Sequence, residues 1–200
     1  MKRLLVSLVA ASVLAGCSTG DDAVAQGGTF EFVAPPGGKT DIFYDPPASR
    51  GTPGPVSGPE LMDTSKTLSL KDFEGKVVVI NVWGGQWCGP CRSEITQLEQ
   101  VYTQTRDLGV AFLGIDVRDN DISAPRDFVV DRKVTFPSIY DPAMRTMIAF
   151  GGKYPPATVI PSTVVLDRQH RVAAVFLREL LAEDLLPVVQ RLAAEPKPAA

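Results

Sequence analysis

The feature that most constrains this chain is a run of β-branched residues that leads into two closely spaced cysteines. Residues 77–82 read VVVINV, and residues 84–91 read GGQWCGPC, with Cys88 and Cys91 three positions apart. An apolar run of this kind is typical of a strand buried on both faces of a parallel sheet. Residues 94–106 then carry apolar side chains at helical spacing. The sequence therefore predicts a buried strand, a turn that holds the cysteines, and a helix.

The composition argues against a metal site or a structural staple at these cysteines. The 200-residue chain contains three cysteines and one histidine, His170. A structural zinc site needs four such ligands, commonly a second cysteine pair or two histidines. A disulfide that closes so short a loop removes little entropy from the unfolded chain, so it stabilises a fold much less than a long-range one. We expect no metal ion and no cofactor.

A redox role for the pair has a direct physical basis. Cys88 is predicted at the start of a helix, where unpaired N–H groups and the helix dipole stabilise a thiolate. The thiolate is the reactive form of cysteine. Cys91 is close enough to attack the same sulfur and so to resolve a mixed disulfide, and Pro90 fits the first helical turn. We therefore predict Cys88 and Cys91 as the catalytic pair.

The rest of the pattern predicts an α/β fold around one mixed sheet. Further strands are expected at residues 110–117, 163–166 and 172–176, the last two as an antiparallel pair. Helices are expected at residues 124–132, with Ser123 as N-cap, at residues 141–150 and at residues 182–194. A short hairpin followed by one helical turn is expected at residues 60–75. This order describes a single globular domain.

The first residues form a targeting segment. Lys2 and Arg3 precede a short apolar run, and residues 14–17 read LAGC, which is the pattern of a secretory signal peptide. The ending resembles a bacterial lipoprotein lipobox, and this resemblance implies cleavage before Cys17 and a lipid on Cys17. Ordinary cleavage near residues 23–25 is the alternative. We expect the mature protein at the extracytoplasmic face of the bacterial membrane, held by lipid.

Charge and proline content complete the division of the chain. The net charge is -3 and no basic patch is present, which disfavours nucleic acid as a partner. Proline and glycine are concentrated between residues 35 and 59, which excludes a regular helix or a central strand there. The expected parts are a signal peptide (1–16), a tether and Pro/Gly-rich extended segment (17–57), a globular domain (58–195) and a tail (196–200).

Two motifs resemble the active-site loops of the thioredoxin superfamily. The first is WCGPC after the strand VVVINV, and the second is VIPST at residues 159–163. The second motif resembles the cis-proline loop of that superfamily. The resemblance implies a thioredoxin fold, a cis Pro161 beside the cysteine pair, and contact of Trp87 and Ile160 with the substrate chain.

A longer match narrows the resemblance to TlpA/ResA-like, membrane-anchored thiol-disulfide oxidoreductases. It covers the segment LSLKDFEGKVVVINVWGGQWCGPCRSE, the insert at residues 119–150 before the cis-proline loop, and the lipoprotein signal. The resemblance implies an enzyme that keeps exported cysteines reduced, notably the haem-binding cysteines of apocytochrome c. It also implies a membrane thiol-disulfide donor that reduces the pair again.

The sequence departs from its relatives at two positions. Thioredoxin has a buried aspartate six residues before the first cysteine, whereas this chain has Val82 there. The loop before Cys88 is one residue longer than the TlpA-like pattern, with the extra length expected at Gly84 and Gly85. By the resemblance, Glu94 takes over proton transfer to and from Cys91, since a carboxylate near a thiol raises its pKa and accepts its proton. The alternative for Glu94 is a first-turn residue that favours the helix dipole.

Three other functions compete with reduction of exported proteins. A disulfide-forming oxidant or isomerase would use the same cysteines, but the Gly-Pro dipeptide between them is shared with the more reducing carriers. A thiol peroxidase has a threonine three residues before its reactive cysteine, where this chain has Gly85. A binding lipoprotein with incidental cysteines is the alternative outside the enzymes.

Overall fold

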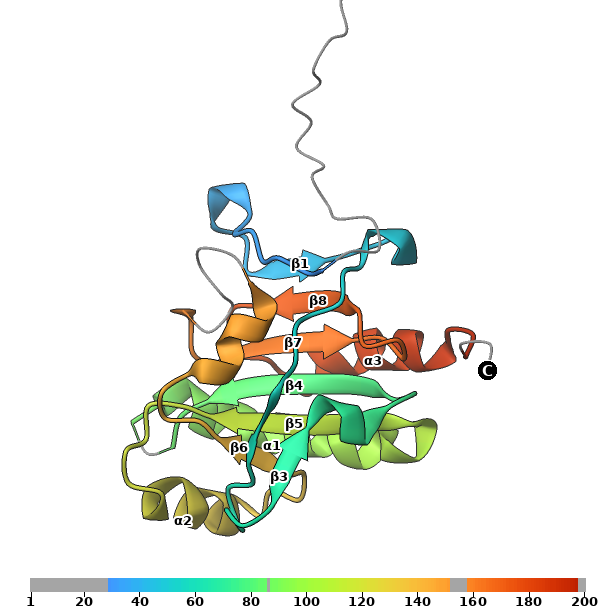
Figure 1. Ribbon diagram of the computed structural model, residues 1–200. Coiled ribbons are helices and arrows are strands. Elements are labelled where there is room, and N and C mark those ends of the chain that lie inside the picture. The colour runs from blue at the N-terminus through green and yellow to red at the C-terminus, as the bar shows by residue number, and fades with distance from the viewer. Residues whose placement is uncertain (1–28, 86, 152–157, 198–200) are drawn as a thin grey trace, which may run out of the picture.

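The computed structural model describes residues 29–85, 87–151 and 158–197, which form a six-stranded mixed sheet flanked by helices (Figure 1). The strand order is β1-β8-β7-β4-β5-β6. Its strands are β1 (Asp41–Phe43), β4 (Val77–Trp83), β5 (Val110–Asp116), β6 (Ser138–Tyr140), β7 (Ser162–Leu166) and β8 (Val172–Phe176). A separate antiparallel pair consists of β2 (Ser57–Pro59) and β3 (Thr67–Ser69). The α-helices are α1 (Gly89–Thr105), α2 (Ser123–Arg132) and α3 (Ala182–Ala194), and the 3-10 helices are η1 (Pro36–Gly38), η2 (Pro47–Ser49), η3 (Leu70–Phe73), η4 (Arg106–Leu108) and η5 (Arg145–Phe150). This is the predicted α/β architecture.

The two central strands lie between two hydrophobic clusters. Strands β4 and β5 run parallel, and both are buried along their whole length. Because successive side chains of a strand point to opposite faces, Val77 and Val79 pack with apolar residues of α1, α2 and α3. Val78 and Ile80 pack on the other face with residues of η5 and of the N-terminal segment. The continuous apolar run is thus explained by burial on both faces.

The Pro/Gly-rich segment crosses the second face of the sheet. Strand β1 pairs antiparallel with β8 at one edge, and the chain then runs across the sheet to β2 beside β6 (Figure 1). Backbone hydrogen bonds attach it on the way, from Gly54 N–H to Ala149 O at 2.6 Å and from Val172 N–H to Gly51 O at 2.8 Å. A Cβ at Gly58 would lie 2.5 Å from a methyl carbon of Ile139, so only glycine permits this close approach. The segment is therefore attached to this face of the sheet through its backbone.

Arg50 ties the same segment to the C-terminal part of the chain. Its side chain is completely buried. It donates hydrogen bonds to Tyr44 O at 3.1 Å, to Asp167 at 3.1 Å and to Glu195 at 2.7 Å, and it forms an ion pair with Asp45 at 2.9 Å. All five donors of a guanidinium favour such multiple pairing. The cation is therefore compensated by three carboxylates.

Helix α1 begins at Gly89, directly after Cys88, so Cys88 stands at the helix start as predicted. The structure corrects the predicted elements in three other places. At α2, Ser123 is already helical, and the carboxylate of Asp121 accepts its N–H at 3.0 Å, so Asp121 does the capping expected of Ser123. The helix expected at residues 141–150 is a 3-10 helix that starts at Arg145. Strand β6 was missed because three residues carry no readable period.

Two expectations concern residues outside the described ranges. The signal peptide at residues 1–16 and Cys17 with its lipid belong to this part of the chain.

Within residues 29–85, 87–151 and 158–197, no helix has the length and apolar character needed to cross a bilayer. The insert predicted between β5 and the cis-proline loop holds α2, β6 and η5.

Candidate active site

The two cysteines lie at the start of α1 and are joined as a disulfide. Cys88 is the N-cap residue of α1, and Cys91 lies in its first turn. The side chains are 3 % and 2 % exposed, and their Cα atoms are 5.3 Å apart. The backbone N–H of Cys91 points at the sulfur of Cys88, at 3.2 Å. When the disulfide opens, this N–H and the helix dipole stabilise a thiolate on Cys88 rather than on Cys91.

Glu94 places a buried carboxyl group on the same face of α1 as Cys91. It follows Cys91 by three residues, a spacing that brings side chains together on a helix. Glu94 is 1 % exposed, and neither oxygen has a hydrogen-bond partner of normal geometry among the described residues. Burial raises the pKa of Glu94 to about 8, although polar groups of Leu180, Asn81 and Thr163 act in the opposite direction. A carboxyl group with this pKa is well matched to exchange protons with a thiol.

Asn81, not Val82, is the strand residue that faces this carboxyl group. Val82 packs into the hydrophobic cluster on the opposite face of the sheet from the cysteines. The Asn81 amide donates to the Thr163 hydroxyl at 3.1 Å, and both side chains are completely buried or nearly so. The extra residue in the loop before Cys88 shifts the count by one, so counting back six residues reached the wrong face of β4.

The proline loop lies at the same end of the sheet as the cysteines. The Ile160–Pro161 peptide bond is cis, as expected. Strand β7 begins directly after it and pairs antiparallel with β4, with Ser162 opposite Val82. The start of β7 therefore adjoins the end of β4 that leads to Cys88. Pro161 is buried and Ile160 is partly exposed, so the loop closes the site on one side.

Trp87 is the most exposed side chain of the predicted site. It lies beside Cys88 with 47 % of its surface exposed. A Cβ at Gly84 would overlap the Trp87 ring, so the indole folds back over Gly84. His170 is not one of these site residues, and its Nε2 pairs with the backbone oxygen of Phe73 at 3.0 Å. Among the predicted site residues, the structure brings Trp87, Cys88, Cys91, Glu94, Ile160 and Pro161 to one end of the sheet, and Cys17 lies outside the described residues.

A group of acidic residues beside this end was not predicted. Asp116 ends β5, Asp119 follows it, and Asp141 follows β6, and all three are buried. Asp119 accepts a hydrogen bond from Gly85 N–H, in the loop that leads to Cys88, at 2.5 Å. The available signal was an acidic residue that closes the apolar run VAFLGID.

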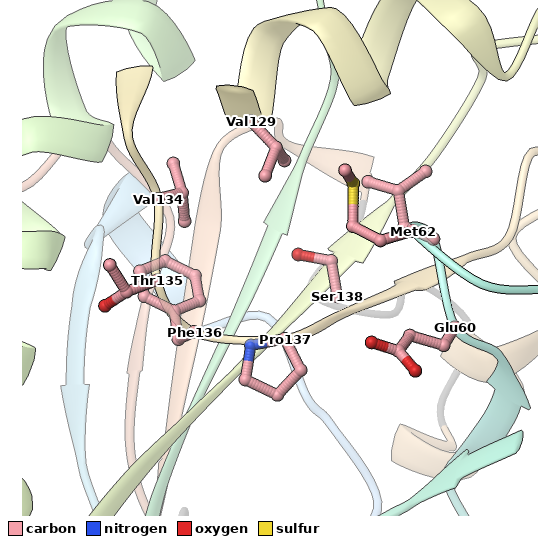
Figure 2. A pocket seen from close by; sticks show the side chains of 9 residues that line it. Glu60, Met62, Val129, Val134, Thr135, Phe136, Pro137 and Ser138 are labelled. Carbon is pink, nitrogen blue, oxygen red and sulfur yellow. The ribbon is translucent and has the colours of Figure 1, made fainter. Parts of the chain in front are cut away.

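A pocket of about 180 Å³ is lined by residues other than those of the predicted site (Figure 2). It is lined by Glu60, Leu61, Met62, Val129, Val134, Thr135, Phe136, Pro137 and Ser138. Figure 2 shows that it lies between α2, the start of β6 and the chain around Met62. Its lining contains no cysteine and no residue of the two active-site loops, so it is separate from the site described above.

Comparison with known proteins agrees with this geometry. Residues 56–175 match the AhpC/TSA family. Thiol-disulfide oxidoreductase ResA of Bacillus thuringiensis subsp. konkukian is 28 % identical over 127 residues, which cover 64 % of this chain and 69 % of the relative. Thiol:disulfide interchange protein DsbE of Pseudomonas aeruginosa is 31 % identical over 157 residues, which cover 76 % of this chain and 82 % of the relative.

A solved structure of a secreted thiol-disulfide isomerase from Corynebacterium glutamicum is also similar. It superposes with a TM-score of 0.79 and 45 % sequence identity, covering 84 % of this chain and 100 % of the other. The predicted thioredoxin fold and oxidoreductase activity are thereby confirmed. The chain belongs to the AhpC/TSA family and is a thioredoxin-fold thiol-disulfide oxidoreductase of the TlpA/ResA-like kind.

Proposed function

We propose that this protein reduces disulfides of exported proteins through Cys88 and Cys91, with apocytochrome c as a client during cytochrome c maturation. The observation that carries the proposal is the buried carboxyl group of Glu94 beside Cys91. In a strongly oxidising protein of this fold, the reduced dithiol form is stabilised because the reactive cysteine is a stable thiolate. A buried carboxyl group that becomes negative opposes a second negative charge on the thiols, and this favours a reducing pair.

The reaction begins with the Cys88 thiolate. It attacks one sulfur of a client disulfide, a Cys88–client disulfide forms, and the first client thiolate leaves and takes a proton. The Cys91 thiol gives its proton to the Glu94 carboxylate, and the new Cys91 thiolate attacks the sulfur of Cys88. The second client thiolate leaves and receives a proton. Two electrons have then passed to the client, and Cys88 and Cys91 form the disulfide seen in the structure.

The two loops around the cysteines bind the client chain in this proposal. Trp87 offers an exposed apolar ring next to Cys88. Ile160, before the cis Pro161, offers backbone groups to an extended client segment, as the thioredoxin resemblance implies. Pro161 fixes this segment against the cysteine pair. A small thiol reagent needs none of these contacts, so their removal should affect protein clients more strongly.

The proposal includes an anchor at the N-terminus. Cleavage before Cys17 and lipidation of its sulfur would hold the domain at the extracytoplasmic face of the membrane. A membrane thiol-disulfide donor would then meet the oxidised pair and return it to the dithiol form. Mass spectrometry of the mature N-terminus tests this part, and an unlipidated terminus near residues 23–25 would contradict it.

The deciding experiment is the reduction potential of the Cys88–Cys91 pair, measured by equilibration with defined thiol buffers. A potential at or below about -220 mV, in the range of reducing carriers, supports reduction of clients. A Cys91→Ser variant should also trap the client as a mixed disulfide with Cys88, and Cys88→Ser is the matched control that traps nothing. Apocytochrome c among the trapped clients supports the proposed pathway, and its absence while other proteins are trapped contradicts that part.

A second candidate is a disulfide isomerase or oxidant. The observation in its favour is the 45 % identity to a protein described as a secreted thiol-disulfide isomerase. A potential near about -120 mV, that of a strong oxidant, would favour it. Direct assays separate the two functions, because an isomerase restores activity to a scrambled multi-disulfide protein without net reduction.

A further inference from the structure

Three buried carboxyl groups gather where β5 and β6 end, next to the loop that precedes Cys88. Asp116 is the last residue of β5, Asp119 lies in the following loop, and Asp141 directly follows β6. Their exposed fractions are 0 %, 8 % and 7 %. The described residues contain no group of three or more His, Cys, Asp or Glu side chains arranged to hold a metal ion. The carboxyl groups must therefore be stabilised by hydrogen bonds or by a proton.

The three groups differ sharply in their hydrogen-bond donors. Asp141 accepts bonds from Arg145 N–H at 3.0 Å, from Thr146 N–H at 2.7 Å and from the Thr146 hydroxyl at 2.6 Å. Asp119 accepts one bond, from Gly85 N–H. Neither oxygen of Asp116 has a donor among the described residues. A buried carboxylate without donors is strongly destabilised, so Asp116 is the one of the three carboxyl groups that is expected to be protonated.

The side chains of Asp116 and Asp119 interact directly. Burial, the side chain of Asp119 and the charges of Asp119 and Asp141 together raise the pKa of Asp116 to about 9, with burial as the largest cause. Two carboxylates are both acceptors, so they form a hydrogen bond only when one of them carries a proton. A protonated Asp116 supplies the donor that it otherwise lacks, and its partner is Asp119.

Asp119 in turn is tied to the active-site loop and to the sheet. The hydroxyl of Tyr140, at the end of β6, donates to the backbone oxygen of Asp119 at 2.8 Å. On the loop side, a Cβ at Gly85 would lie 2.9 Å from the Asp119 carboxylate and 3.5 Å from Pro125 Cα. Gly85 therefore permits the loop, which is one residue longer than the TlpA-like pattern, to rest directly on Asp119. The loop is held from the side opposite to the proline loop.

We propose that Asp116 and Asp119 share one proton and together hold Gly85 in the loop before Cys88, so that Asp116 acts as a positioning residue for Cys88. The inference rests on disulfide exchange at the cysteine pair, and it is independent of the direction of electron flow. When base removes the shared proton as water, two adjacent negative charges repel each other. The bond to Gly85 N–H is then weakened, and Cys88 loses its fixed position.

Other titratable groups around the pair decide how it must be tested. Tyr140, at the end of β6, and Asp141, directly after it, face the Asp116–Asp119 pair, and Asp121 lies two residues beyond Asp119 in the same loop. Burial and the nearby acidic residues raise the pKa of Tyr140. Glu94 on α1 titrates in a neighbouring range, near pH 8. Measurements in the Glu94→Gln background remove that contribution. Asp127, exposed on α2, provides a matched control in which one surface negative charge is removed by the same Asp→Asn change.

The test follows the backbone amide of Gly85 by nuclear magnetic resonance in the full oxidised chain between pH 7 and 10.5. We expect its nitrogen shift to change in one step near pH 9, with and without Glu94→Gln. Asp116→Asn should remove the step, because an amide donates to Asp119 and does not ionise. Asp127→Asn should retain it. A flat shift in the unmodified protein, or a step that persists in Asp116→Asn, would overturn the proposal.

A kinetic measurement separates positioning from mere stability. Reduction of the oxidised pair by dithiothreitol at pH 7 should be at least threefold slower in Asp116→Ala than in Asp116→Asn, because only asparagine restores the donor. Equal rates in the two variants would contradict a positioning role, and if Asp116→Ala does not fold, the amide titration alone decides. A client assay that fails while the Gly85 step is present would count against the proposed function and not against this pair.

Discussion

The two ends of the central sheet treat buried charge in opposite ways. At the end formed by the start of β4 and the end of β7, Arg50 is completely buried and compensated by Asp45, Asp167 and Glu195. At the other end, next to the cysteines, Glu94 and Asp116 are buried without hydrogen-bond donors of normal geometry. The antiparallel register of β7 on β4 separates these two sets of groups along the strands.

The difference shows where the fold uses charge for stability and where it keeps charge for chemistry. A buried cation with several carboxylate partners fixes the N-terminal segment and the C-terminus in one arrangement, and removing one partner leaves a costly orphan charge. Carboxyl groups without partners keep raised pKa values and can exchange protons near neutral pH. Such groups destabilise the native state when they ionise, which is the expected signature of a functional end.

The largest effect is expected from Arg50→Ala at the compensated end. Removal of the guanidinium takes a completely buried cation away from three carboxylates and leaves buried Asp167 with Arg171, which is partly exposed, as its remaining cation among the described residues. We expect the free energy of unfolding to fall by about 3 kcal/mol, the lower end of the range for a broken buried ion pair. Denaturant unfolding measures this change. The folded fraction should retain its reaction with dithiothreitol, because Arg50 lies far from the cysteines. A loss below about 1 kcal/mol would remove the contrast between the two ends.

The next effect concerns Glu94 and has the opposite sign. Its pKa is about 8 in the folded chain against an ordinary value of 4.5, so the native state binds more protons between these pH values. Stability therefore falls as pH rises through this window. Glu94→Gln should remove the part of this fall that comes from Glu94, leave the part that comes from Asp116, and raise the free energy of unfolding at pH 9 by about 2–4 kcal/mol.

The control for that measurement is Glu74→Gln, since Glu74 is exposed. It should leave the pH dependence of unfolding as it is in the unmodified protein. If Glu94→Gln shows the same decline in stability between pH 5 and 9 as the unmodified chain, Glu94 is not the buried acid that causes it.

The same variant should change the kinetics of exchange by a smaller amount. Without a carboxylate to accept the Cys91 proton, release of the mixed disulfide should slow by at least about tenfold at pH 7. This is less than the full effect of a general base, because a group of pKa about 8 is only partly ionised at pH 7. The deficit should shrink as pH rises and solvent deprotonates Cys91. If the rate were lower by the same factor at every pH, Glu94 would act on the structure of the site rather than on proton transfer.

The smallest effect is expected at the rim of the compensated end. Arg191 is 44 % exposed and pairs with Asp45 at 3.1 Å. Because exposed ion pairs are screened by water, Arg191→Ala should lower the free energy of unfolding by no more than about 1 kcal/mol. An effect as large as that of Arg50→Ala would show that the whole ion network, rather than the buried cation, holds this end together.

Local patterns were sufficient for the central part of the fold. The apolar runs of β4 and β5 and the limits of α3 were read from periodicity, and the tertiary structure adds little to them. The cysteine pair and the proline loop were found from two short motifs. Strand β6 was not found, because three residues carry no period. The cap at Asp121 was not found, because Asp and Ser side chains serve equally well as caps.

The chemistry of this protein can be read from short local patterns, because the reactive sulfurs, the helix that follows them and the proline loop each lie within a few consecutive residues. Which charges are compensated depends instead on contacts between distant parts of the chain. Arg50 meets Asp167 across 117 positions, and Gly85 meets Asp119 across 34. Burial and pairing depend on such distant contacts, and a pKa depends on both, so the protonation of Glu94 and Asp116 was decided by the packed fold.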